Sequence, residues 1–225
     1  MPEMKNRVEP TPDGLAMPDP AGALPATRRG QRVLLAGAFL VWLLVVTTGL
    51  GKLWAYAETP GPAARASAVW PAATRLARDV HRPTLLVFAH PQCPCSRATI
   101  GELALLMTHV QDRVMAFVIF YRPLTEEAGW EQTDLWRSAA AIPGVRVVAD
   151  DNGADAAVFD AATSGQTMLY DAGGRLMFSG GMTGARGHSG DNAGRTALTA
   201  LINEGRSATS RTPVFGCLLG TVRTE

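Results

Sequence analysis

Residues 84–110 read TLLVFAHPQCPCSRATIGELALLMTHV and contain the clearest structural pattern in the chain. Thr84 to Ala89 is an unbroken apolar run, which predicts a strand buried on both faces. His90 to Cys95 has the composition of a turn. Ser96 to Val110 places apolar residues along one side, which predicts an amphipathic helix. These residues therefore predict a strand, a turn and a helix, with two cysteines in the turn.

The turn carries Cys93 and Cys95, and the sequence has one further cysteine, Cys217. Three cysteines are too few for a disulfide scaffold, so the close pair indicates chemistry. A helix N-terminus lowers the pKa of a thiol because its free N–H groups and dipole favour negative charge. Pro94 fits the first helical turn, where its missing N–H is not needed. The Cys-Pro-Cys pair is therefore predicted to be reactive, with Arg97 adding positive charge.

A disulfide between Cys93 and Cys95 would close a small ring. Disulfides have a preferred Cα separation and dihedral angle, so a tight ring is expected to be strained. Because strain raises the reduction potential, the spacing predicts an oxidising or isomerising couple. Cys217 is expected to be a buried or free thiol, although the C-terminal segment is long enough for it to form a mixed disulfide with one of the pair.

The rest of the domain continues this alternation of strands and helices. Further strands are expected at residues 114–121, 145–149, 166–170 and 175–179, the last two forming a hairpin. Further helices are expected at residues 71–80, 131–141, 154–162 and 191–203. This order predicts an α/β domain over residues 70–205, built on a mixed sheet with helices on both faces. Residues 206–225 are then a C-terminal extension.

Residues 33–50 are an uncharged apolar run, and with residues 51–56 they approach the length needed to cross a bilayer, so a transmembrane helix is predicted at 33–56. Three arginines precede the run, at positions 28, 29 and 32, whereas Lys52 is the single basic residue near its end. The positive-inside bias therefore places residues 1–32 in the cytoplasm and the domain on the other side of the membrane. The prediction is a single-pass inner-membrane protein with a periplasmic domain.

The segments around the predicted transmembrane helix have no periodic pattern. Residues 1–32 are interpreted as a disordered cytoplasmic tail and residues 57–69 as a linker. The alternative is a signal peptide cleaved after Ala57, because Ala55-Tyr56-Ala57 fits the small-x-small cleavage pattern. Both alternatives export the domain to a compartment that permits disulfides. A net charge of +1 without a basic stripe excludes a nucleic-acid partner.

Three segments carry a resemblance to known proteins: HPQCPCSR at 90–97, LMFSGGMTGARGHSGDNAGR at 176–195 and TPVFGC at 212–217. Together they resemble RedB-type thioredoxin-like proteins. Residues 147–176 are also similar to the inserted strand and helix, and the hairpin that follows them, in the TlpA/ResA branch of membrane-anchored thioredoxins. The resemblance implies a thioredoxin-like fold and a thiol–disulfide oxidoreductase that needs no bound cofactor. Its partners would be a client protein with a thiol or disulfide and a membrane electron donor or acceptor.

The resemblance implies a role for each site residue. Cys93 is expected to attack and Cys95 to resolve. Substrate binding is expected from Gly165, Gln166 and Thr167, which stand where thioredoxins have a cis-proline, and from Arg186 and His188 in the glycine-rich loop that follows the hairpin. The chain departs from the family twice, because one residue is missing between the cysteines and no proline stands at 164–167.

A metal site is the alternative reading of the same residues. Two thiolates and an imidazole suit Cu(I), and Cys93, Cys95 and His188 supply them, with His90 or Cys217 as possible additions. Such a site resembles that of Sco-type copper-delivering proteins, although the cysteine spacing differs. Under this hypothesis the chain is a copper-binding accessory protein. A scaffold that only binds a partner is a third possibility.

Overall fold

The computed structural model describes residues 26–220, so most of the predicted cytoplasmic tail lies outside the described residues. The first element is helix α1 (Ala26–Glu58), whose 33 residues correspond to about 50 Å. It is long and apolar enough to cross a membrane. Residues 26–32, predicted to be part of the tail, are instead its first turns. The chain divides after Gly49 into two compact units, and the second unit contains the α/β domain.

The domain is built on one sheet of five strands in the order β3-β2-β1-β4-β5. Strands β1, β2 and β3 are parallel, whereas β4 is antiparallel to both β1 and β5. The strands are β1 (Thr84–Ala89), β2 (Met115–Arg122), β3 (Val145–Asp151), β4 (Thr167–Tyr170) and β5 (Leu176–Gly180). All six residues of β1 are buried, as its position at the centre of the sheet requires. The predicted mixed sheet is confirmed.

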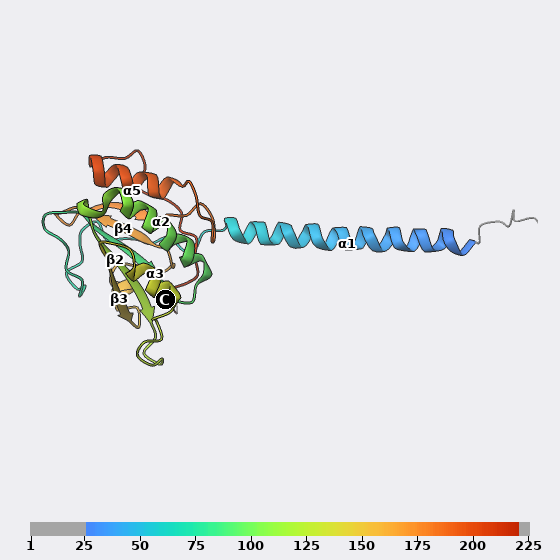
Figure 1. Ribbon diagram of the computed structural model, residues 1–225, viewed down its shortest axis with the longest axis horizontal. Helices are drawn as coiled ribbons and strands as arrows, with labels where there is room; N and C mark the ends of the chain where they lie inside the picture. The colour runs from blue at the N-terminus through green and yellow to red at the C-terminus, as the bar shows by residue number, and fades with distance from the viewer. Residues whose placement is uncertain (1–25, 221–225) are drawn as a thin grey trace, which may run out of the picture. The chain divides into compact units, whose positions relative to one another are not determined.

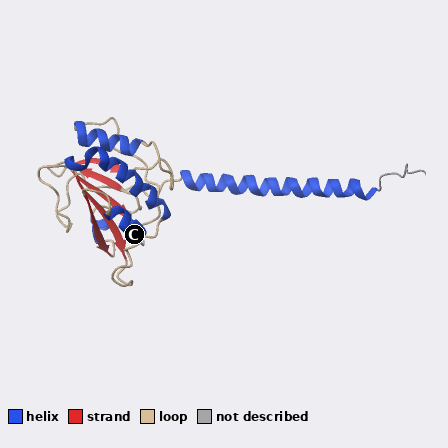
Figure 2. Ribbon diagram, in the orientation of Figure 1, coloured by secondary structure: helices blue, strands red, loops and turns tan. Residues whose placement is uncertain are grey.

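Helices cover the two faces of the sheet unequally. One face packs against α2 (Pro94–Val110), α3 (Asp134–Ala140) and α5 (Ala193–Glu204), and α2 and α5 lie side by side (Figure 1). The short helix α4 (Ala154–Val158) and an irregular segment around Trp70 cover the other face. Figure 2 shows the strands of the domain as a single sheet with α2 and α5 beside it. The side chains of β1 alternate between the two apolar clusters, because successive residues of a strand point to opposite faces.

The helix predicted at residues 71–80 is wrong, because the structure has turns there and no helix. Local polar side chains explain the difference. Thr74 accepts a hydrogen bond from the N–H of Leu76 at 3.1 Å, and Asp79 accepts from the N–H of His81 at 2.8 Å. Such side-chain bonds to nearby backbone groups compete with helix formation. The predicted helix at 154–162 ends early at Val158, two residues before Asp160, which has a φ of 53°.

The described part of the C-terminal extension belongs to the domain. Val214, Phe215 and Leu219 are buried, and Leu219 joins the apolar cluster on the face opposite α2. The predicted linker also packs here, since the N–H of Gly61 donates to the carbonyl of Val214 at 2.8 Å. The extension therefore runs back along the domain toward the cysteine turn.

Candidate active site of three cysteines

Cys93 occupies the N-cap position of α2, directly after the turn that follows β1. Its φ of −84° and ψ of 116° are extended, and Pro94 begins the helix. The Cys93 N–H donates to the carbonyl of His90 at 3.1 Å, and the Ser96 N–H donates to the carbonyl of Cys93 at 3.1 Å. Cys93 is 4% exposed. The predicted position of this thiol at a helix N-terminus is thus what the structure shows.

His90 supports the turn through its ring. The ring stacks on Tyr121 and lies nearly perpendicular to the ring of Trp130, with centroids 5.8 Å apart in both pairs. Its Nδ1 accepts a hydrogen bond from the N–H of Gln92 at 3.2 Å. Burial lowers the pKa of His90, which favours the neutral imidazole. His90 therefore has a structural part in holding the turn.

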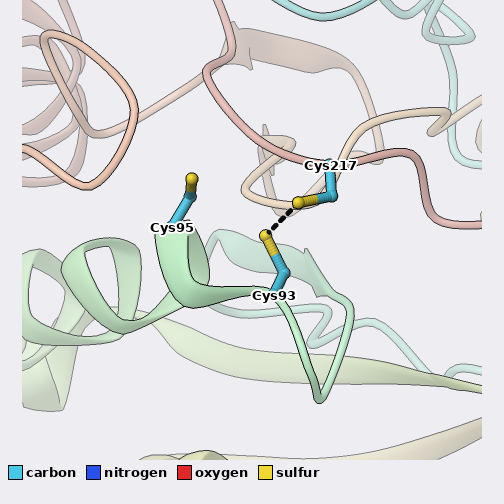
Figure 3. Close-up of side chains that lie close together, drawn as sticks. All are labelled: Cys93, Cys95 and Cys217. Atoms are coloured by element: carbon cyan, nitrogen blue, oxygen red, sulfur yellow. Dashed lines mark hydrogen bonds between the residues drawn. The ribbon is translucent and has the colours of Figure 1, made fainter. Parts of the chain in front are cut away.

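Cys217 lies opposite Cys93, with the two Sγ atoms 2.9 Å apart (Figure 3). The backbone fixes this position, because the Ser164 N–H donates to the carbonyl of Cys217 at 2.8 Å. Gly216 makes the approach possible, since a Cβ there would stand 1.9 Å from the carbonyl oxygen of Ser164. The sequence predicted no fixed position for Cys217. The glycine before it and the apolar pair Val214-Phe215 are the signals that indicate a packed segment.

Cys95 completes a group of three thiols whose Sγ atoms all lie within 4.8 Å of one another. It stands in the first turn of α2, and its side chain is partly exposed. Figure 3 shows the Cys93 side chain directed toward Cys217, whereas Cys95 extends separately from the helix. His188 is not a member of the group, and its side chain is exposed.

The three thiols differ in acidity. Burial raises the pKa of Cys93, but hydrogen bonds from Cys217 and Ser96 outweigh it, so this pKa lies below its usual value. Burial, followed by the negative charge of Cys93, raises the pKa of Cys95. Burial and the hydrogen bond to Cys93 raise the pKa of Cys217 to about 12. Of the two facing thiols, Cys93 is therefore the first to lose its proton, and Cys217 then keeps its S–H as the donor to Cys93.

Arg186 supplies the positive charge beside the group. Its guanidinium lowers the pKa of both Cys95 and Cys217, although burial outweighs this effect at each. It also donates a short hydrogen bond to the carbonyl of Gly216, directly before Cys217. Its Nε is buried without a hydrogen-bond partner among the described residues. The structure thus brings Arg186 to the cysteines, as a residue that holds the C-terminal segment.

The residues predicted to bind substrate at the start of β4 are engaged within the protein. Gln166 donates to the Ser179 hydroxyl at 3.1 Å, Thr167 donates to the carbonyl of Gly165 at 3.2 Å, and the side chains of Gln166 and Thr167 are buried. Gly165 has a φ of 93°, and the described residues contain no cis peptide bond. The residue that reaches the cysteine turn is Ser164, which sequence reasoning did not single out.

Ser164 links three parts of the site. Its hydroxyl accepts from the His90 N–H at 2.8 Å and lies 2.6 Å from the hydroxyl of Ser96. Its own N–H holds Cys217, as described above. Ser96 in turn hydrogen-bonds to Cys93 and lowers its pKa, although burial acts in the opposite direction. Ser164 therefore joins the turn, the start of α2 and the C-terminal segment in one network.

Comparisons with known proteins support the fold. No protein-family model and no curated protein match the chain. An uncharacterized conserved protein from Geobacillus kaustophilus is 16% identical, with a TM-score of 0.53, over 75% of this chain and 95% of that one. A hypothetical protein from Sinorhizobium meliloti 1021 is 20% identical, with a TM-score of 0.50, over 72% of this chain and 93% of that one.

A third solved structure is a secreted Mycobacterium tuberculosis disulfide oxidoreductase, homologous to E. coli DsbE. It is 16% identical, with a TM-score of 0.38, over 54% of this chain and 80% of that one. The class of fold follows from the sheet order, with three parallel strands beside an antiparallel hairpin and the cysteine turn at the start of α2. The chain has a thioredoxin-like fold, as the sequence predicted.

Proposed function

We propose that the chain is an exported, membrane-tethered thiol–disulfide oxidoreductase in which Cys93 is the attacking thiol. The observation that carries the proposal is the placement of Cys93 at the N-cap of α2 with the Cys217 thiol 2.9 Å away. The thiolate is the reactive form of cysteine, and both features stabilise it. The three segments described from the sequence support a RedB-type relationship within this class.

The reaction needs no bound cofactor. The Cys93 thiolate attacks one sulfur of a client disulfide, a mixed disulfide forms, and the second client sulfur leaves as a thiolate. A second protein thiol must then resolve the mixed disulfide, and both Cys95 and Cys217 lie close enough to do so. A dithiol electron donor in the membrane would restore the reduced protein. The same steps in reverse would oxidise a client.

Helix α1 would tether the domain on the periplasmic side, with its arginine-flanked end in the cytoplasm. A membrane-impermeant maleimide applied to intact cells with a permeabilised outer membrane tests this orientation. Cys95 is the partly exposed thiol at the start of α2, and we expect it to be labelled without lysis. Labelling only after lysis of the inner membrane would contradict the orientation. The intact mass of the membrane-bound protein decides whether the chain is cleaved after Ala57.

The attacking thiol is identified with the full chain in detergent, reduced and then exposed to oxidised glutathione. We expect Cys93→Ser to lose exchange, because no other thiol has a lowered pKa. Cys95→Ser is the matched control, since it removes a neighbouring thiol and keeps the N-cap thiolate. Exchange that survives in Cys93→Ser and disappears in Cys95→Ser would refute the assignment.

The cluster of three sulfurs favours a second candidate function, the binding of a soft metal ion. Three thiolates within 4.8 Å of one another suit Cu(I), and Cys217 takes the place in the group that the sequence had given to His188. Competition titration of the reduced chain with Cu(I) and a chelator tests this. Tight one-to-one binding that is lost in Cys217→Ser and kept in His188→Ala, without any disulfide exchange, would replace the oxidoreductase proposal.

A further inference from the structure

The C-terminal segment is built into the domain on both sides of Cys217. Upstream, the N–H of Gly181 donates to the carbonyl of Pro213 at 3.2 Å. Downstream, Leu218 forms an antiparallel bridge with Thr163, and the N–H of Leu219 donates to the carbonyl of Ala162 at 2.9 Å. The segment therefore follows the backbone that leads into β4 as an added strand does. Cys217 is held over Cys93 by its neighbours.

Cys95 is poorly placed to form a disulfide with Cys93. Cys93 is the N-cap of α2 and Cys95 is the second residue of the helix. Residues two apart on a helix do not face each other. Their Sγ atoms lie within 4.8 Å of each other, but a bond between them would distort the first turn, which begins at Pro94 and carries the bond from the Ser96 N–H to the Cys93 carbonyl.

Cys217 meets no such obstacle. Its Sγ already lies 2.9 Å from that of Cys93, and a disulfide bond is about 2.0 Å long. The two cysteines are 124 residues apart in sequence, so their disulfide would not close a tight local ring. Closure needs a small shift of two side chains and no change in α2. The fold therefore favours a disulfide between Cys93 and Cys217.

We propose that the protein's own disulfide joins Cys93 and Cys217, which makes Cys217 the resolving cysteine. This inference rests on the proposed exchange function and deepens it. After Cys93 has formed the mixed disulfide, Cys217 attacks the Cys93 sulfur. The bond between Cys93 and the client sulfur breaks, and the client leaves as a thiol with the proton from Cys217. The client disulfide gains two electrons in total, and Cys93 and Cys217 lose them.

The order of these steps follows from the site. When Cys93 is ionised, the Cys217 thiol 2.9 Å away keeps its proton as the hydrogen-bond donor and is not a nucleophile. Once Cys93 is bonded to a client sulfur, that negative charge is gone and the proton of Cys217 is no longer held there. Arg186 donates a hydrogen bond to the carbonyl of Gly216, and its positive charge then favours the Cys217 thiolate. Cys217 thus becomes available at the step that needs it.

The test uses the full chain in detergent, reduced, mixed with oxidised glutathione and quenched at intervals for intact mass. Wild type and Cys95→Ser are expected to lose two hydrogens and to show no lasting glutathione adduct. Cys217→Ser keeps a donor to Cys93 and therefore keeps the first step. Because it lacks the neighbouring attacking thiol, its adduct on Cys93 is expected to last at least about 100-fold longer than in Cys95→Ser.

Gly216→Ala is the second variant, and it retains all three thiols. Its Cβ would stand 1.9 Å from the Ser164 carbonyl oxygen, so the segment must move and the adduct is expected to accumulate as in Cys217→Ser. A lasting adduct in Cys95→Ser, with rapid closure in Cys217→Ser, would overturn the inference and leave the exchange function standing. The absence of any adduct or disulfide in all variants would instead refute the exchange function itself.

Discussion

Replacing Cys217 with alanine should raise the pKa of Cys93. Burial acts to raise this pKa, and the hydrogen bond from Cys217 is the largest effect that opposes it. Alanine removes the donor and leaves the thiolate buried with Ser96 as its remaining partner. Serine at the same position keeps an O–H donor on the same Cβ, so Cys217→Ser is the matched control. We expect its Cys93 pKa to stay near that of the parent.

The size of the shift follows from the bond that is lost. A hydrogen bond to a charged group contributes roughly 1.5–3 kcal/mol, and thiols are weak donors, so we take a value of about 1.4 kcal/mol. This corresponds to about one pKa unit for Cys93. Below the pKa, the thiolate fraction then falls about tenfold. A more basic thiolate is a better nucleophile, with a Brønsted coefficient of about 0.4–0.5, so the net fall in rate is about threefold.

The assay is the rate of alkylation of Cys93 by iodoacetamide as a function of pH, followed by peptide mass in a Cys95→Ser background. The rate rises with pH and levels off above the pKa, and the alanine variant should show this rise at higher pH. An unchanged midpoint in Cys217→Ala would refute the reasoning. Equal shifts in Cys217→Ala and Cys217→Ser would show that packing, and not the donor, controls the thiolate.

Three further substitutions test the stability of the domain and the effect of the positive charge beside Cys95. Glu102 is fully buried and pairs with Arg195 at 2.7 Å, so Glu102→Ala should cost about 3–5 kcal/mol in chemical denaturation. Tyr170→Phe removes a 3.0 Å hydrogen bond to a main-chain carbonyl and should cost about 1 kcal/mol by the same measurement. Arg186→Met removes a positive charge and should raise the pKa of Cys95, seen as slower alkylation of this thiol at a fixed pH.

The sequence predicts the elements whose signals are local. β1 is a continuous apolar run, and α2 has a periodic apolar face and begins at a proline, so both were found nearly at their true bounds. The helix predicted at 71–80 is wrong because polar side chains of this segment form hydrogen bonds with the nearby backbone. The position of Cys217 could not be predicted for a different reason. Its place depends on backbone contacts with Ser164, which lies far away in sequence and forms no pattern with it.

The short Cys-Pro-Cys spacing and the third cysteine have one explanation under the proposed scheme. A longer turn can bring a second cysteine back toward the first, whereas here Cys95 already belongs to the first turn of the helix, which a bond to Cys93 would distort. The C-terminal segment supplies a thiol from the opposite side. The backbone before β4 holds that segment through a hydrogen bond from an N–H group, which a proline would lack. The Ser164 N–H that anchors Cys217 is such a donor, and a proline at this position could not provide it.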